Sequence, residues 1–323
     1  MKKQSRIFVA GHRGLVGSAI QRGLERQGYS GLLLRTRREL DLFDASAVDD
    51  FFSSHRPEYV FLAAARVGGI LANNSFPADF LRENLAIQSN LIDASYRHGV
   101  ERLLFLGSSC IYPQVAPQPI REEYLLSGEL EPTNRPYALA KIAGIEMCWS
   151  YNRQYGTRYL AAMPTNIYGP NDNFDLHTSH VLPALIRKML NARDEGRKEA
   201  VVWGTGTPRR EFLFSDDLAE ACIYLMNLSD PALNSMLNAD AAPIINIGCG
   251  EDISIRDLAE LVARVVGFEG RLVFDSTRPD GTPRKLLDVS RMRSLGWTAK
   301  IQLEDGIRRV LASISVDTQP AIL

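Results

Sequence analysis

The stretch Gly11-His12-Arg13-Gly14-Leu15-Val16-Gly17 decides the fold of this chain. It directly follows a short apolar run at residues 6–10 and opens a helical pattern at residues 15–27, so it predicts a turn from a strand into a helix. Glycines in such a turn let the backbone approach a diphosphate, which then lies at the positive end of the helix. We therefore expect all seven residues to contact a dinucleotide.

The rest of the first half alternates apolar runs with helical patterns. Apolar runs at residues 32–34, 59–63, 103–106 and 159–163 are separated by helical patterns at residues 45–54, 76–98 and 137–155. Strands separated by helical crossovers form a parallel sheet, and near-continuous apolar strands indicate helices on both faces. We predict an α/β fold with a doubly wound parallel sheet, a Rossmann domain, over residues 1–165.

Residues 166–323 are less regular. Residues 164–180 are rich in Pro, Asn, Gly and Asp and predict a long loop, which in a compact domain is usually functional. Helical patterns follow at residues 180–191, 216–227, 254–266 and 303–313, with short strands near residues 201–203, 244–247 and 271–274. We predict a smaller mixed α/β substrate domain, some segments of which pack back on the first domain.

The composition argues against several kinds of partner. With 37 Lys and Arg against 38 Asp and Glu, the net charge of −1 favours neither nucleic acid nor an anionic membrane. No apolar run is long enough for a transmembrane helix, and the one near the start is too short for a signal peptide. The spacing of the four cysteines favours reduced thiols over disulfides or a metal site, so we expect a cytoplasmic protein without a metal.

The residues after the second predicted strand indicate which dinucleotide binds. In an NAD-binding domain this strand ends in an acidic residue that takes the ribose hydroxyls. Here it runs into Arg35-Thr36-Arg37-Arg38, and a guanidinium can hold a 2′-phosphate through two hydrogen bonds. Arg13 adds a further positive charge, so the sequence predicts NADP(H).

Tyr137 and Lys141 are four residues apart, so they share one face of the predicted helix at residues 137–155. We expect the lysine charge to lower the pKa of the tyrosine, so that its phenol can exchange a proton with a substrate oxygen. Ser108, at the end of the preceding strand, can hydrogen-bond the same oxygen. A solvated Tyr–Lys pair is common by itself, but the glycine loop and Ser108 make this one a candidate catalytic pair.

Together these features resemble the extended short-chain dehydrogenase/reductase family, whose members use the GxxGxxG spacing and act largely on nucleotide sugars. Within it, residues 5–300 are similar to the GDP-L-fucose synthase group. The stretches that carry this similarity are AARVGGI at residues 64–70, GSSCIYP at 107–113, PTNIYGPNDNF at 164–174, SHVLPA at 179–184 and PDGTPRK at 279–285.

The resemblance implies an NADPH-dependent conversion of GDP-4-keto-6-deoxy-D-mannose to GDP-L-fucose. The ketone acidifies the protons on carbons 3 and 5, so inverting these centres needs a base on one face and an acid on the other. The resemblance assigns Cys110 as the base and His180 as the acid, with Tyr137, Lys141 and Ser108 at the ketone oxygen. Without it, Cys110 fits a packed thiol and His180 a residue at a helix start.

The resemblance also implies the binding residues and the assembly. Trp203 can stack on a flat ring and Arg210 can clamp a diphosphate, with Asp280 beside them. Lys188 stands where the family often has arginine, keeping the charge but losing the fork. A homodimer is implied through a four-helix contact of the helices at residues 76–98 and 137–155. Beyond the glycine loop, cofactor contacts are expected at Arg37, Arg38, Asp41, Leu42, Leu106, Gly107, Ser108, Lys141, Pro164, Asn166, Ile167 and His180.

Three other functions are weighed against this one. A 4,6-dehydratase of the same fold would carry an acidic pair beside the catalytic hydroxyl, where this chain has Ser109-Cys110. A 4-epimerase would hold NAD tightly and should show an acid in place of residues 35–38. A non-catalytic dinucleotide sensor would usually lose the pair that this chain keeps at Tyr137 and Lys141.

Overall fold

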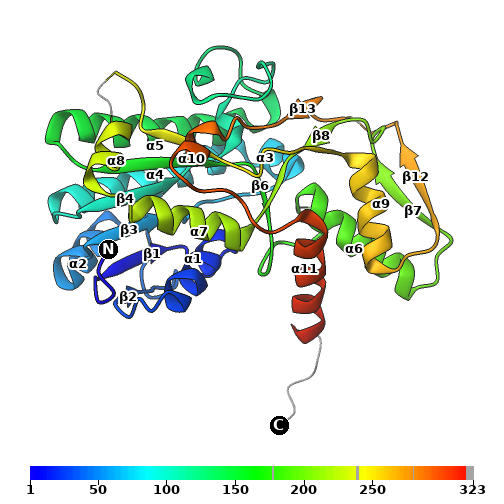
Figure 1. Cartoon of the computed structure of the whole chain (residues 1–323), viewed down its shortest axis with the longest axis horizontal. Helices are drawn as coiled ribbons and strands as arrows, with labels where there is room; N and C mark the ends of the chain where they lie inside the picture. The colour runs from blue at the N-terminus through cyan, green and yellow to red at the C-terminus, as the bar shows by residue number, and fades with distance from the viewer. Residues whose placement is uncertain (177, 238–239, 279, 318–323) are drawn as a thin grey trace, which may run out of the picture.

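The computed structural model describes residues 1–176, 178–237, 240–278 and 280–317. Its centre is a six-stranded parallel sheet in the order β10-β5-β4-β3-β1-β2 (Figure 1). The strands are β1 (Ile7–Ala10), β2 (Leu32–Leu33), β3 (Tyr59–Leu62), β4 (Arg102–Leu106), β5 (Tyr159–Pro164) and β10 (Ile244–Ile247). The doubly wound α/β prediction is therefore confirmed.

Helices cover both faces of this sheet because its strands are apolar on both sides. Ile7 and Val9 of β1 point into one core, with α1 (Leu15–Arg26) and α7 (Ser215–Met226). Phe8 and Ala10 point into the other. The helices of that second face are α2 (Ala45–His55), α4 (Pro77–Arg97) and α5 (Arg135–Tyr155). The packing fixes the carboxyl ends of the strands, where ligands bind in such folds.

The chain returns to this sheet after residue 165, as expected for some later segments. Helix α7 packs on one face of the sheet, and β10 pairs with β5 at the sheet edge. One cut at residue 165 therefore does not divide the chain into two continuous units. The stretch at residues 164–180 is also not entirely a loop, because β6 (Asn166–Tyr168) pairs in parallel with β9 (Phe212–Phe214).

The second part is smaller and built from short strands. Its core is formed largely by α6 (Val181–Asp194) and α9 (Ile255–Val266) against β7 (Glu199–Trp203), which pairs with β12 (Arg271–Asp275). A separate three-stranded sheet has the order β11-β8-β13. The remaining elements are β8 (Arg209–Arg210), β11 (Ile253–Ser254), β13 (Arg284–Lys285), α3 (Ile70–Ser75), α8 (Asp230–Met236), α10 (Ser290–Ser294), α11 (Leu303–Asp317) and the short helices η1 (Ser109–Ile111), η2 (Glu122–Tyr124) and η3 (Pro132–Asn134).

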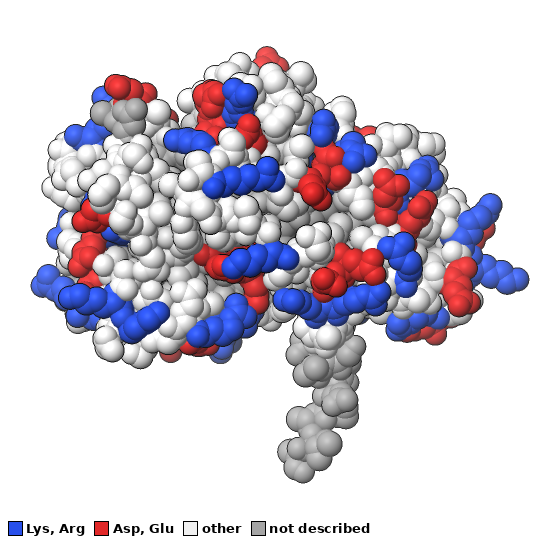
Figure 2. Space-filling view, viewed as in Figure 1, with Lys and Arg blue, Asp and Glu red and all other residues white. Residues whose placement is uncertain are grey.

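Charges of both signs are intermixed over the face shown in Figure 2, with no large area of a single sign. No helix among the described residues has the length and apolar character that a membrane crossing requires. Within the same residues, no cluster of three His, Cys, Asp or Glu side chains is arranged to hold a metal ion.

Candidate active site

A cavity of about 2080 Å³ lies where the two parts of the chain meet. Every residue that the sequence nominated for catalysis, cofactor binding or substrate binding lines it. The glycine loop and the ends of β3 and β4 form one side, and α6, β7 and the β8–β13 sheet form the other. Residues far apart in the sequence thus share one site.

The glycine loop is shaped by close backbone contacts. Gly11 has φ of +85°, and a Cβ added there would lie 2.8 Å from the backbone of Ala64. A Cβ on Gly17 would lie 2.1 Å from the carbonyl oxygen of Gly11. Gly14 caps α1 without a side-chain hydrogen bond, so the first N–H groups of this helix, beside the cavity, have no side-chain cap. This arrangement fits a diphosphate.

Three arginines on this side are available for an anion. Arg13, Arg37 and Arg38 are exposed, and their side chains make no hydrogen bond or ion pair with the rest of the described chain. Arg35 is different, because its Nη2 lies 2.9 Å from Nε2 of His55. The nearby acid Glu39 accepts hydrogen bonds from the N and Oγ1 of Thr36, which lower its pKa. These contacts leave the three arginines as the groups suited to a 2′-phosphate.

Tyr137 and Lys141 lie together on α5, but their electrostatics differ from expectation. Lys141 is 3% exposed, and its Nζ donates a 2.7 Å hydrogen bond to the carbonyl oxygen of Leu106. Burial lowers the pKa of Lys141 to about 8. Burial also raises the pKa of Tyr137, and the sulfur of Cys110 adds to this rise. The predicted lowering of the Tyr137 pKa is therefore wrong for this structure, and its phenol stays protonated.

Cys110 lies in η1, directly after β4, and is 8% exposed. Its backbone N donates a 3.3 Å hydrogen bond to Oγ of Ser108, which places both side chains at the same end of the cavity. Burial raises the pKa of the Cys110 thiol, while the charges of Lys285 and Lys141 oppose that rise. Cys110 is therefore a packed thiol that also faces the cavity.

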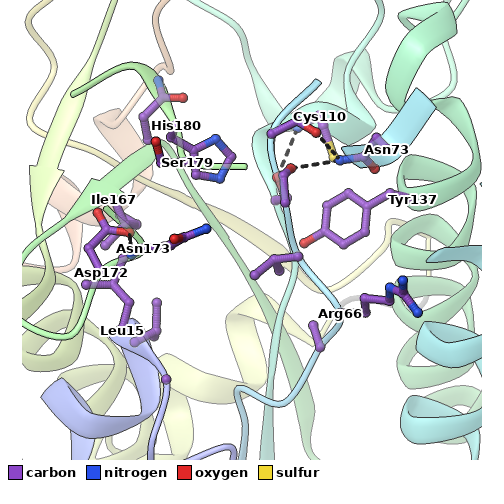
Figure 3. A pocket seen from close by; sticks show the side chains of 18 of the residues that line it. Leu15, Arg66, Asn73, Cys110, Tyr137, Ile167, Asp172, Asn173, Ser179 and His180 are labelled. Carbon is purple, nitrogen blue, oxygen red and sulfur yellow. Dashed lines mark hydrogen bonds between the residues drawn. The ribbon is translucent and has the colours of Figure 1, made fainter. Parts of the chain in front are cut away.

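His180 stands on the opposite wall, at the start of α6. Figure 3 shows its ring and the Tyr137 phenol extending into the cavity from facing walls, with Cys110 on the Tyr137 side. Burial lowers the pKa of His180, which favours the neutral imidazole. A molecule held between these walls would meet the thiol on one face and the imidazole on the other.

The end of the cavity that is formed by the second part of the chain gathers aromatic and cationic groups. Trp203 is 53% exposed, and its ring lies 4.7 Å from Nζ of Lys188 and 5.0 Å from Cζ of Arg278. Arg210 donates a 2.8 Å hydrogen bond to the backbone of Arg209. The carboxylate of Asp280 accepts hydrogen bonds from the N and Oγ1 of Thr205, at 3.0 and 2.7 Å. Asp280 thus has a structural role, because it holds the backbone at Thr205 in place.

The sequence did not single out several cavity residues. Oδ2 of Asp172 is buried without a hydrogen-bond partner among the described residues, and burial raises the pKa of this carboxyl to about 7. Figure 3 places Asp172 near Leu15 and Ile167. Lys285, Arg278 and Arg66 also line the cavity. The only signal for Asp172 and Lys285 was their place in the family-like stretches, because isolated charges have no periodicity.

The chain matches the NAD dependent epimerase/dehydratase family over residues 7–248. It is 57% identical over 305 residues to GDP-L-fucose synthase 1 of Arabidopsis thaliana, covering 94% of this chain and 91% of the relative. Identity to the GDP-L-fucose synthase of Escherichia coli (strain K12) is 56% over 310 residues, 95% of each chain. The structure of MlghC, a GDP-mannoheptose C4 reductase from Campylobacter jejuni with NADP bound, is 41% identical with a TM-score of 0.89, covering 98% of this chain and 99% of that one.

Proposed function

The chain belongs to the NAD dependent epimerase/dehydratase family and, within it, to the GDP-L-fucose synthases, and from this premise we propose its reaction and the residues that perform it. It converts GDP-4-keto-6-deoxy-D-mannose to GDP-L-fucose with NADPH, inverting carbons 3 and 5 and reducing the ketone at carbon 4. The observation that carries the assignment of residues is the position of Cys110 and His180 on facing walls, beside the pair of Tyr137 and Lys141.

Inversion uses both walls of the cavity. The thiolate of Cys110 removes the proton from carbon 3 or carbon 5, and the electron pair of the broken C–H bond moves toward the ketone oxygen. Tyr137 and Ser108 stabilise this enolate by hydrogen bonding. His180 returns a proton to the opposite face of the same carbon, which completes the inversion. Desolvation lowers its pKa, so we expect proton return to weaken as the pH rises.

Reduction uses only the wall that carries Ser108, Tyr137 and Lys141. NADPH, when bound, supplies the hydride that reduces the ketone. Tyr137 then gives its proton to the oxygen at carbon 4, and its raised pKa keeps the phenol protonated for this step. Lys141, with its Nζ bonded to the end of β4, holds a positive charge beside the phenol.

The residues that would hold the cofactor fit its chemistry. The uncapped first turn of α1, with Gly11 to Gly17, suits the diphosphate. Arg37 and Arg38 suit the 2′-phosphate, with Arg13 as an additional cation. We assign the cavity walls at Asp41, Leu42, Leu106, Gly107, Pro164, Asn166 and Ile167 to the remainder of the dinucleotide.

The second part of the chain would hold the guanine nucleotide. Arg210 offers a fork for the diphosphate, and Lys188 a point charge. Trp203 offers an aromatic face for a ring or sugar. Asp280 shapes this part of the cavity through its hydrogen bonds with Thr205. Its carboxylate can accept a further hydrogen bond from the substrate.

We also propose that the protein is a homodimer in the cytoplasm. The helices α4 and α5 lie side by side, and Tyr96 and Tyr155 stack across them with ring centroids 4.1 Å apart. Both rings are exposed, at 37% and 45%, so a second copy could cover them in a four-helix contact. Sedimentation measurements should give twice the mass of one chain. The four free cysteines suit a reducing compartment.

The decisive experiment is incubation with NADPH and GDP-4-keto-6-deoxy-D-mannose, followed by NMR of the sugar. The expected product is GDP-L-fucose, with both centres inverted and the ketone reduced. A reduced sugar without inversion would make this protein a C4 reductase instead, and unconsumed NADPH would contradict the proposal altogether.

A further inference from the structure

Lys285 occupies a fixed position in the cavity wall that the proposed reaction does not use. It ends β13, opposite Arg210 of β8 in parallel register. The two residues after Lys285 are held by hydrogen bonds to two different segments of the chain. Leu286 N donates to Oε1 of Gln118 at 2.9 Å, and Leu287 N donates to Oε2 of Glu211 at 3.0 Å. The backbone that carries Lys285 is therefore tied to the segment that follows Cys110.

The ammonium of Lys285 is not committed elsewhere. Its side chain makes no hydrogen bond or ion pair within the described residues, although it is only partly exposed where it lines the cavity. The acid whose charge reaches Lys285 is Glu131. Its carboxylate already accepts hydrogen bonds from the N and Oγ1 of Thr133 and from the N of Asn134. Lys141, in contrast, is held by the carbonyl oxygen of Leu106.

Lys285 and Cys110 line the same cavity, and the charge of the lysine reaches the thiol. Of the charges acting on this thiol, that of Lys285 is the largest, ahead of that of Lys141 from α5. The charge of the Cys110 sulfur also raises the pKa of Tyr137 of α5, and His180 stands across the cavity. Burial alone would keep Cys110 as an unreactive thiol, so a base at this position needs a cation beside it.

We propose that Lys285 is a positioning residue whose ammonium stabilises the thiolate of Cys110. The inference rests on the proposed function, because it explains how a buried thiol serves as the base for inversion. The cation comes from the second part of the chain and the thiol from the end of β4. The base is therefore complete only when both parts of the chain are folded together. Reduction, which does not need the thiolate, should not depend on Lys285.

The first test measures the thiol itself, without substrate. The rate of Cys110 alkylation by iodoacetamide is followed against pH, with the background of Cys110→Ser subtracted. In Lys285→Met the midpoint should rise by about one pH unit or more, so alkylation near neutral pH should fall about tenfold. Lys285→Arg should restore most of the rate, and Lys198→Met, at an exposed lysine outside the cavity, should behave as the parent.

The second test measures the reaction. Deuterium uptake at carbons 3 and 5 in heavy water, without cofactor, should fall about tenfold near neutral pH in Lys285→Met and recover in Lys285→Arg. Binding of NADPH should be unchanged. If Lys285→Met folds poorly, Lys285→Gln carries the same test with a smaller change in polarity.

An unchanged alkylation midpoint in a folded Lys285 variant would overturn the proposal. If such a variant lost affinity for GDP instead, Lys285 would be a diphosphate contact and the proposal would be wrong. The proposed function fails in a different way. If Cys110→Ser took up deuterium as fast as the parent, Cys110 would not be the base, whatever the alkylation midpoint.

Discussion

The two walls of the cavity are built differently. Ser108, Tyr137 and Lys141 come from the end of β4 and from α5, two long elements of the central fold. His180, Arg210 and Lys285 come from a helix start and from two-residue strands in the second part. In the proposed mechanism, the first wall carries everything that the protein supplies to reduction, whereas inversion takes its two proton-transfer groups from opposite walls. The two half-reactions should therefore be separable by mutation.

The walls should also differ in how firmly they are held. The strands β3 and β5 are buried throughout, as is β4 after Arg102, and Nζ of Lys141 donates a hydrogen bond to the backbone of β4. The second wall depends on paired two-residue strands and on polar contacts such as that between Asp280 and Thr205. Such short elements gain their order from tertiary contacts rather than from their own length.

The largest effect is expected from removing the proton donor of the first wall. Tyr137→Phe should lower turnover by about two to four powers of ten, the usual contribution of a positioned acid. NADPH binding should change little, because the phenol is not needed to hold the dinucleotide. Turnover and cofactor affinity are measured in parallel, with Tyr29→Phe, a buried phenol bonded to Asn227, as the matched control. Near-normal turnover would mean that the proton comes from elsewhere.

The next effect should separate the walls. Cys110→Ser should slow deuterium uptake at carbons 3 and 5 by about 100-fold or more, because a serine hydroxyl is a far weaker base than a thiolate. The variant should still reduce the ketone slowly, on a sugar that has not been inverted. His180→Asn should show a related defect, since an amide cannot deliver the returning proton.

Product identity and deuterium uptake, both by NMR, check this separation. Cys249→Ser, which lies outside the cavity lining, is the control. Should Cys110→Ser exchange deuterium as fast as the parent, the thiol would be only packed, and the comparison between the walls would lose its chemical meaning.

A smaller effect is expected at the cofactor end of the first wall. Arg37→Glu should weaken NADPH binding by about tenfold or more, because a charge-assisted hydrogen bond is lost and a repulsive charge gained. Binding of NADH should change much less. Fluorescence titration with both cofactors checks this, with Arg197→Glu, at an exposed arginine outside the cavity, as the control. Equal affinity of the parent for the two cofactors would contradict the assignment of Arg37.

The smallest effect concerns stability rather than chemistry. Asp172 has a pKa of about 7 in the folded protein, against an ordinary value of 3.8. The folded state therefore binds this proton more tightly, and the linked stability is present in acid and lost as the pH rises through about 7. Asp172→Asn should be more stable than the parent at about pH 8, by on the order of 1 kcal/mol, and the gap should close in acid.

Chemical denaturation at several pH values measures this gap. Asp50→Asn, at an exposed carboxylate of α2, should show no comparable pH dependence. If Asp172→Asn gained no stability in alkali, the buried Oδ2 would have a partner such as water in solution.

Sequence patterns predicted the central fold more completely than the second part. Strands such as β1 and β3, and helices such as α4 and α5, lie within one or two residues of their predicted bounds, because continuous apolar runs and helical periodicity are local signals. The strands β6, β8 and β13 were missed. Each has two or three residues, and each exists only because a distant segment pairs with it.

The sequence by itself determined the family, the dinucleotide fold, the preference for NADP(H) and a part of the residues that line the cavity. These follow from local spacing, as in the glycine loop, and from long family-like stretches. Only the tertiary structure decided which groups face one another and in what protonation state. Burial reversed the expected pKa direction of Tyr137 and left Oδ2 of Asp172 without a hydrogen-bond partner among the described residues, and the fold placed Lys285 and Cys110 in one cavity. The physical reason is that desolvation and charge proximity depend on distances through space, and spacing along the chain does not fix them.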